Sequence, residues 1–187
     1  MNALKQIEQL QPQEIEKRSF EIIGEELAAR GITLPKDQEM ITKRVIHTSA
    51  DFEYTKTLMY SKDAVRIAQD LICEGADIVT DTNMALAGIN KKALATFGGE
   101  AHCFMADPEV ARLAKERGTT RATVSMEMAA RIDKPVIFAV GNAPTALIQI
   151  DKMMRESNWR PAFVIGVPVG FVNVEAAKEL MIESDVP

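Results

Sequence analysis

The apolar positions between residues 136 and 150 form the clearest pattern of the chain. Five apolar residues, Val136–Val140, follow one another without polar alternation, which is typical of a strand buried on both faces of a parallel sheet. Gly141 permits a sharp turn, Asn142 is a favourable N-cap residue, and Pro144 suits the first turn of a helix. We therefore predict a strand that turns tightly into a helix, with unpaired N–H groups and a helix dipole that favour an anion.

The same pattern recurs some twenty residues later. Residues 163–165 are predicted to form a strand, residues 166–170 a loop, and Asn173 the cap of a further helix. Two such units in succession predict right-handed βαβ crossovers, with a ligand crevice at the carboxyl ends of the strands.

Two amphipathic helices are predicted ahead of the strands. Residues 12–30 carry apolar positions at helical spacing, and Gly31 ends this helix. The second helix begins after Pro35 and loses its apolar pattern from His47 onward. His47 is therefore expected in or near the last helical turn.

The rest of the chain alternates between helices and strands. The predicted elements are a helix opened by Ser61 and closed by Gly75, strands at 76–80 and 101–105, a helix from Asp107 to Gly118, and one capped by Thr119 or Thr120. This order predicts a single α/β domain over residues 1–187. We expect a three-layer αβα, Rossmann-like, doubly wound fold with a mostly parallel sheet of four to five strands.

Composition narrows the classes of partner. The chain has 187 residues and a formal net charge of -5, which disfavours nucleic acid or an anionic membrane surface as the main partner. There is no apolar stretch of spanning length, and the first residues lack the apolar region of a signal peptide. We expect a cytoplasmic protein with a small-molecule ligand, binding neither nucleic acid nor membrane.

Several common catalytic and metal-binding motifs are absent from the sequence. It contains no P-loop, no GxGxxG fingerprint, no GxSxG elbow and no HExxH pair. Cys73 and Cys103 lie in apolar segments without CxxC spacing, which predicts two buried reduced thiols rather than a redox pair or metal ligands. We predict no metal site.

One histidine is the best candidate for proton transfer. A helix C-terminus favours the imidazolium form of His47. Arg44 precedes it by three residues and Asp51 follows it by four, so the three side chains share one face if the helix continues. The other histidine, His102, lies between apolar residues of a short strand and is predicted to be a packed side chain.

Two charged residues of the predicted α/β region are further candidates. Asp81 follows a buried strand, where it is either a crevice carboxylate or a turn carboxylate that binds nearby N–H groups, and both interpretations stay open. Arg121 stands in the first turn of a helix, where a cation opposes the helix dipole. An arginine aimed at a bound carboxylate would account for that placement.

Six strings of residues follow one another over nearly the whole chain. They are RSF at 18–20, RVIHTSADFEY from Arg44, GADIVTDTNMALAGI from Gly75, TR at 120–121, GNAPTAL from Gly141 and GVPVGFVNVEAAK from Gly166. Together they resemble the precorrin-8X methylmutase family, also called cobalt-precorrin-8 methylmutase. The GNAPTAL and PVGFV strings are the most specific.

The resemblance implies an isomerase of cobalamin biosynthesis. A methyl group would migrate from C-11 to C-12 of a corrin precursor, precorrin-8X or cobalt-precorrin-8, without a separate cofactor and in a homodimer with active sites near the subunit interface. The catalytic histidine of the family maps onto His47. Candidate substrate contacts, from matched motifs and from the reasoning above, are Arg18, Ser19, Arg44, Asp81, Thr120, Arg121, Gly141, Asn142 and Thr145.

Two expectations complete the prediction. The family usually continues beyond Pro187 with another strand and a glycine-rich basic segment, so we expect this sequence to lack both. A non-catalytic tetrapyrrole carrier that holds the acidic product is the alternative function, and a Rossmann-type nucleotide-binding protein is a more remote one.

Overall fold

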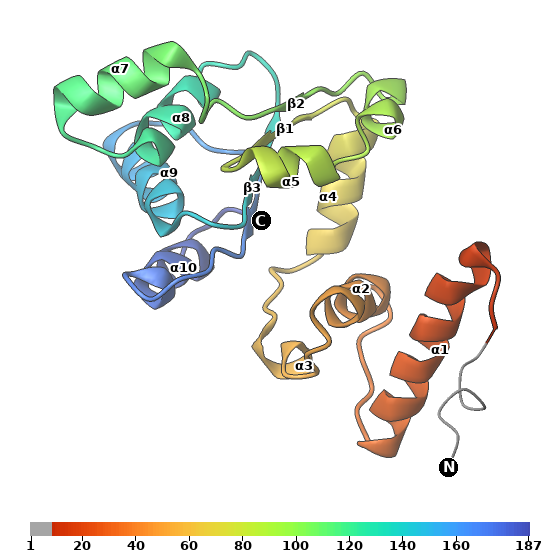
Figure 1. Cartoon of the computed structure of the whole chain (residues 1–187). Helices are drawn as coiled ribbons and strands as arrows, with labels where there is room; N and C mark the ends of the chain where they lie inside the picture. The colour runs from red at the N-terminus through yellow and green to blue at the C-terminus, as the bar shows by residue number, and fades with distance from the viewer. Residues whose placement is uncertain (1–8) are drawn as a thin grey trace. The chain divides into compact units, whose positions relative to one another are not determined.

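The computed structural model describes residues 9–187 and divides into two compact units (Figure 1). The helical unit ends at Tyr60 and the α/β unit begins at Ser61. No helix among the described residues is long and apolar enough to cross a membrane.

The helical unit contains α1 (Pro12–Ala29), α2 (Glu39–Ser49) and the short α3 (Tyr54–Thr57). Helices α1 and α2 pack through buried Ile23, Leu27 and Ile46, which confirms the two predicted amphipathic helices. Ala50, at φ 56°, ends α2 in the left-handed region. His47 therefore lies in the last turn of α2, as predicted.

Asp51 was predicted to share a helix face with Arg44 and His47 if the helix continued beyond His47. Because the helix stops at Ser49, Asp51 does not continue the face that carries Arg44 and His47. Its carboxylate instead accepts the N–H of Glu53 at 2.9 Å, in the turn before α3. The predicted cluster of cation, imidazole and carboxylate is not formed by this aspartate.

The α/β unit is built on four parallel strands in the order β2-β1-β3-β4. They are β1 (Asp77–Thr80), β2 (Ala101–His102), β3 (Val136–Val140) and β4 (Phe163–Gly166). The sheet confirms the predicted α/β class. Strand β1 has β2 on one side and β3 on the other, so the topological switch point of this doubly wound sheet lies at the carboxyl ends of β1 and β3.

Seven helices of the described chain belong to this unit. They are α4 (Ala64–Cys73), α5 (Asn83–Gly88), α6 (Lys91–Thr96), α7 (Pro108–Arg117), α8 (Arg121–Ala129), α9 (Pro144–Glu156) and α10 (Val174–Ile182). Figure 1 shows α8, α9 and α10 on one side of the sheet and α4, α5 and α6 on the other. Phe138 of β3 and Leu147 and Ile150 of α9 are fully buried at the centre of the main core.

Some local predictions need correction. The strand expected at 101–105 is paired only over Ala101–His102, because Phe104 and Met105 turn to pack against the core. Cys73 is exposed and Cys103 half-buried, so the expectation of two buried thiols was wrong, although both are free.

The start of α9 differs from the prediction, and the last residues of the chain have a contact that was not predicted. The N-cap of α9 is Ala143 rather than Asn142. The carbonyl of Pro187 accepts the N–H of Val164 at 2.9 Å, so the last residues of the chain lie beside β4.

Candidate functional site

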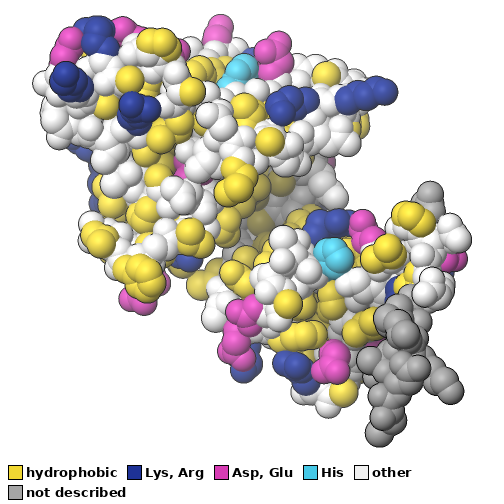
Figure 2. Space-filling model, in the orientation of Figure 1, with side chains coloured by type: hydrophobic (Ala, Val, Ile, Leu, Met, Phe, Trp, Pro, Cys, Tyr) yellow, Lys and Arg dark blue, Asp and Glu magenta, His cyan; other side chains and the backbone are white. Residues whose placement is uncertain are grey.

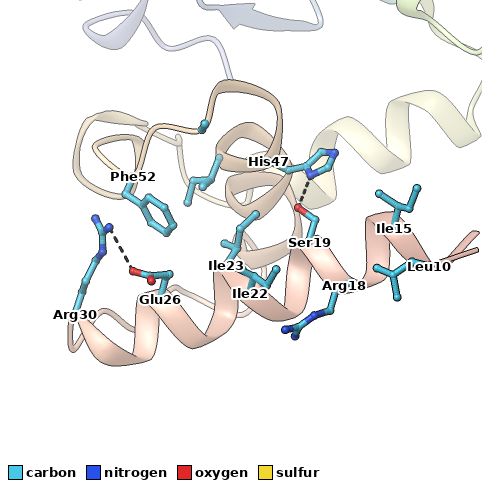
Figure 3. A pocket seen from close by; sticks show the side chains of 12 residues that line it. Leu10, Ile15, Arg18, Ser19, Ile22, Ile23, Glu26, Arg30, His47 and Phe52 are labelled. Atoms are coloured by element: carbon cyan, nitrogen blue, oxygen red, sulfur yellow. Dashed lines mark hydrogen bonds and ion pairs between the residues drawn. The ribbon is translucent and has the colours of Figure 1, made fainter. Parts of the chain in front are cut away.

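His47 contacts two neighbouring residues of α1, Ser19 and Phe20. Its Nδ1 lies 2.7 Å from the Oγ of Ser19, and its ring packs on that of Phe20 in a T-shaped contact with centroids 5.6 Å apart. Figure 3 shows the Ser19 hydroxyl directed at the imidazole. Two predicted site residues, 28 positions apart in sequence, are thus brought together by the packing of α1 on α2.

An open groove of about 630 Å³ lies beside this pair. Its walls are largely apolar, and Ile15 and Ile22 on α1 are 54% and 43% exposed there. Figure 2 shows hydrophobic side chains reaching the surface of the helical unit. An exposed apolar lining next to a histidine is suited to a ligand with a broad apolar face.

The arginines of the helical unit lie in ion pairs. Arg18 is 3.6 Å from both Glu21 and Glu25, and Figure 3 shows its side chain directed away from His47. Arg30 pairs with Glu26 at 3.5 Å and stacks over the ring of Phe52. These pairs place fixed charges around an otherwise apolar groove.

Arg44 reaches from α2 back to α1. Its guanidinium is 2.6 Å from a carboxylate oxygen of Glu16, and it lies 5.2 Å from the ring centroid of Phe20. It also borders a second groove of about 480 Å³, lined by Met40, Ile41 and Val45 among others. The structure therefore adds two residues that the sequence did not single out, Glu16 and Phe20, of which only Phe20 carried a signal, as part of the RSF string.

The switch point of the sheet is occupied by a carboxylate of the protein itself. Asp81, 0% exposed, accepts the N–H groups of Gly141, Asn142 and Ala143 at 3.0, 2.8 and 2.6 Å. Of the two interpretations left open for Asp81, the structure shows the turn carboxylate. The anion site predicted at this turn is real, but its anion is the Asp81 side chain, so these N–H groups are not free to bind a ligand.

The first turns of α8 and α9 bring two predicted residues together. The hydroxyls of Thr120 and Thr145 are 3.3 Å apart, and Thr120 also caps α8 by accepting the N–H of Thr123. Arg121, the first residue of α8, is exposed and forms no hydrogen bond or ion pair within residues 9–187. A guanidinium in that position is available to a carboxylate ligand.

His102 is a packed side chain, as predicted. Its Nε2 lies 3.1 Å from the carboxylate of Asp77, and its ring stacks on Phe104. Burial raises the pKa of Asp77, but hydrogen bonds from the Glu100 N–H, His102 and Lys134 outweigh it, so the pKa lies below its ordinary value. This cluster is a structural ion-pair network within the α/β unit.

No group of three or more His, Cys, Asp or Glu side chains within the described chain has the arrangement of a metal site. The fold and the site define an α/β protein with a histidine beside an open apolar groove. This histidine is its candidate acid–base group.

Comparison with known proteins makes the assignment specific. A family model described as precorrin-8X methylmutase matches residues 14–187. Cobalt-precorrin-8 methylmutase of Priestia megaterium is 40% identical over 95% of this chain and 78% of its own length, and that of Salmonella typhimurium 43% identical over 95% and 84%. The crystal structure of precorrin-8X methylmutase from Thermus thermophilus matches with a TM-score of 0.81 and 37% identity, over 94% of this chain and 84% of that one.

The chain belongs to the precorrin-8X methylmutase family, isomerases of cobalamin biosynthesis that move a methyl group within precorrin-8X. The resemblance drawn from the six strings is thus confirmed at the level of the family. The roles of individual residues stay predictions.

Proposed function

We propose that this chain catalyses the migration of a methyl group from C-11 to C-12 of precorrin-8X or of its cobalt-bearing counterpart. Its membership of the methylmutase family supports this reaction, and the groove beside His47 supports the proposed location of the active site. The single observation that carries the proposal for the site is the placement of His47 at the end of α2, next to an open apolar groove.

The proposed mechanism uses one proton and no cofactor. Protonated His47 gives its proton to the conjugated ring, which localises charge there and lowers the barrier to the methyl shift. His47 then takes a proton back once the methyl group has moved, so the reaction is a net isomerisation. General acid–base catalysis of this kind contributes typically about 10²–10⁴-fold to the rate.

The acidic periphery of the substrate would be bound by arginines. A corrin precursor of this class carries many acetate and propionate groups, and a guanidinium binds carboxylate with two parallel hydrogen bonds. Arg44 already holds a carboxylate, that of Glu16, so a substrate carboxylate would take that position. Arg18, Arg121, Thr120, Thr145 and the side chain of Asn142 are further proposed contacts.

The buried Asp81 is assigned a supporting role. Since it binds three N–H groups of the 141–143 turn, it would shape that turn rather than touch substrate. Gly141 would likewise contribute through the conformation of the turn, because its N–H is occupied.

A homodimer in the cytoplasm is part of the proposal. The segment before α10 exposes several apolar side chains, with Phe171 fully exposed and Val169 and Val172 mostly so, and patches of this kind mark contact surfaces. In Figure 2 hydrophobic side chains reach the surface over the part of the α/β unit that carries α10. Phe171→Ser is expected to shift sedimentation toward the monomer, whereas Met84→Ser, at another exposed apolar side chain, is not; an unchanged Phe171→Ser dimer would remove this surface from the proposal.

The activity is tested under single-turnover conditions. With protein in excess over precorrin-8X, we expect the visible spectrum to change to that of the methyl-shifted product, since the migration alters ring conjugation. Heat-unfolded protein serves as the control. A complex that forms while the spectrum stays that of the substrate would identify a carrier and contradict the enzyme.

A further inference from the structure

The imidazole of His47 has one hydrogen-bonding partner in the described chain. That partner is the Ser19 hydroxyl, 2.7 Å from Nδ1, and no other hydrogen bond or ion pair of the ring is found within residues 9–187. Nδ1 is therefore engaged inside the protein. Nε2 is the nitrogen left for a ligand.

The groups around Ser19 and His47 show whether the partner of Nδ1 is neutral or charged. Ser19 is half-buried on α1, and the imidazole ring also packs against the ring of Phe20. The carboxylate that follows in sequence, that of Asp51, is directed to the N–H of Glu53 instead. The partner of Nδ1 is thus neutral, in contrast to the carboxylate that His102 contacts.

We propose that Ser19 accepts a hydrogen bond from Nδ1–H of His47 and so fixes the tautomer that leaves Nε2 as the proton-transfer atom. The inference rests on the proposed function, and it changes the role expected for Ser19 from substrate contact to positioning residue. The hydroxyl oxygen can accept from Nδ1–H both in the imidazolium and in the neutral ring.

The proton balance follows from this tautomer. In the imidazolium both nitrogens carry hydrogen. The proton on Nε2 is given to the substrate, while the hydrogen on Nδ1 stays on the ring and is accepted in a hydrogen bond by the Ser19 hydroxyl. The neutral ring then has a lone pair on Nε2, which takes the returning proton. If Ser19 donated to Nδ1 instead, the neutral ring would carry its hydrogen on Nε2 and could not accept a proton there.

A neutral acceptor also suits a group that must release its proton. A carboxylate next to Nδ1 would stabilise the imidazolium and make it a weaker acid. A hydroxyl fixes the same tautomer and ring orientation without adding charge.

The tautomer is measured directly by nitrogen NMR. In protein labelled with ¹⁵N-histidine, the His47 signals are assigned by comparison with His102→Asn, since the chain has two histidines. Above the titration range of the ring we expect hydrogen on Nδ1 in the wild type, and a shift toward the Nε2–H form in Ser19→Ala. Hydrogen on Nε2 in the wild type, unchanged in Ser19→Ala, would overturn the inference.

Kinetics separate positioning from substrate contact. We expect Ser19→Ala to lower kcat roughly tenfold, by analogy with the groups that orient metal-ligating histidines. KM should change little, and Ser19→Thr should restore most of the rate. Thr48→Ala is the matched control. Thr48 is the residue after His47, and its hydroxyl donates to the Arg44 carbonyl and not to the His47 ring. A rise in KM at unchanged kcat in Ser19→Ala would overturn the positioning role and return Ser19 to the substrate contacts.

The two proposals fail in different ways. The NMR measurement needs no turnover, so an Nδ1–H tautomer that depends on Ser19 supports the hydrogen bond and the tautomer even if precorrin-8X is not converted, and in that case only the proton-transfer role of Nε2 is rejected. Conversion of precorrin-8X together with an Nε2–H tautomer would keep the proposed function and reject the role of Ser19.

Discussion

The helical unit and the α/β unit differ in the size of their buried apolar core. In the α/β unit, Phe138, Leu147 and Ile150 are fully buried, and the buried carboxylates Asp77 and Asp81 each bind several donors. In the described part of the helical unit, Ile15 and Ile22 stay exposed along the groove beside His47. The larger core thus lies in the α/β unit, and the small core of the helical unit is flanked by an open apolar groove.

The two histidines, one in each unit, also differ in their surroundings. His102 contacts a buried carboxylate and an aromatic ring, an arrangement that fixes a structural network. His47 contacts a neutral hydroxyl and borders an open groove. A histidine that exchanges a proton with a ligand must be within reach of that ligand, which fits the second environment.

Removing the carboxylate of Asp81 gives the largest expected loss of stability. Asp81→Ala leaves three N–H groups of the 141–143 turn without their acceptor, which we expect to lower the free energy of unfolding by about 3 kcal/mol. Urea unfolding measures the change, with Ala at the exposed Asp133 as the matched control. Equal stability of the two variants would show that the carboxylate does not hold the turn.

A smaller, pH-dependent effect is expected at Asp77. Its pKa is lowered in the folded state, so its contribution is present above the ordinary aspartate pKa and is lost as the pH falls through the lower folded value. Asp77→Asn should cost about 1–2 kcal/mol at pH 7 and lose less stability than the wild type on acidification below about pH 4. Parallel losses in the two proteins would contradict this assignment.

The smallest effect is expected where Arg44 meets Glu16. This exposed ion pair contributes little to stability, about 0–1 kcal/mol, but Glu16 competes with a substrate carboxylate for the guanidinium. Glu16→Gln should therefore lower KM about two- to fivefold, within that same energy range. Glu53→Gln, which removes the partner of Lys56 in the same unit, controls for net charge; an equal drop in KM there would indicate a general charge effect.

The features predicted correctly from the sequence depend on neighbouring residues. The uninterrupted run Val136–Val140 forms β3, and the spacing of apolar residues in 12–30 forms α1. The same periodicity placed His47 in the last turn of α2. Local patterns sufficed because the burial of a strand, or of one face of a helix, determines the spacing of apolar residues that are close together in the sequence.

The features that escaped prediction join distant residues. Asp81 reaches a turn about sixty residues further on, and Ser19 meets His47 across two helices. Neither contact has a periodic signal, so residue types alone left Asp81 ambiguous. The resemblance named Ser19 and His47 as site residues without indicating that they touch each other.

The central claim is that proton transfer belongs to His47 and that His102 is structural. Single-turnover conversion of precorrin-8X by His47→Ala and His102→Ala, measured with the unfolding temperature of each variant, tests it most directly. We expect His47→Ala to keep the wild-type unfolding temperature and lose at least about a hundredfold in rate, and His102→Ala to unfold earlier while converting substrate at close to the wild-type rate. Wild-type conversion by His47→Ala would contradict the claim.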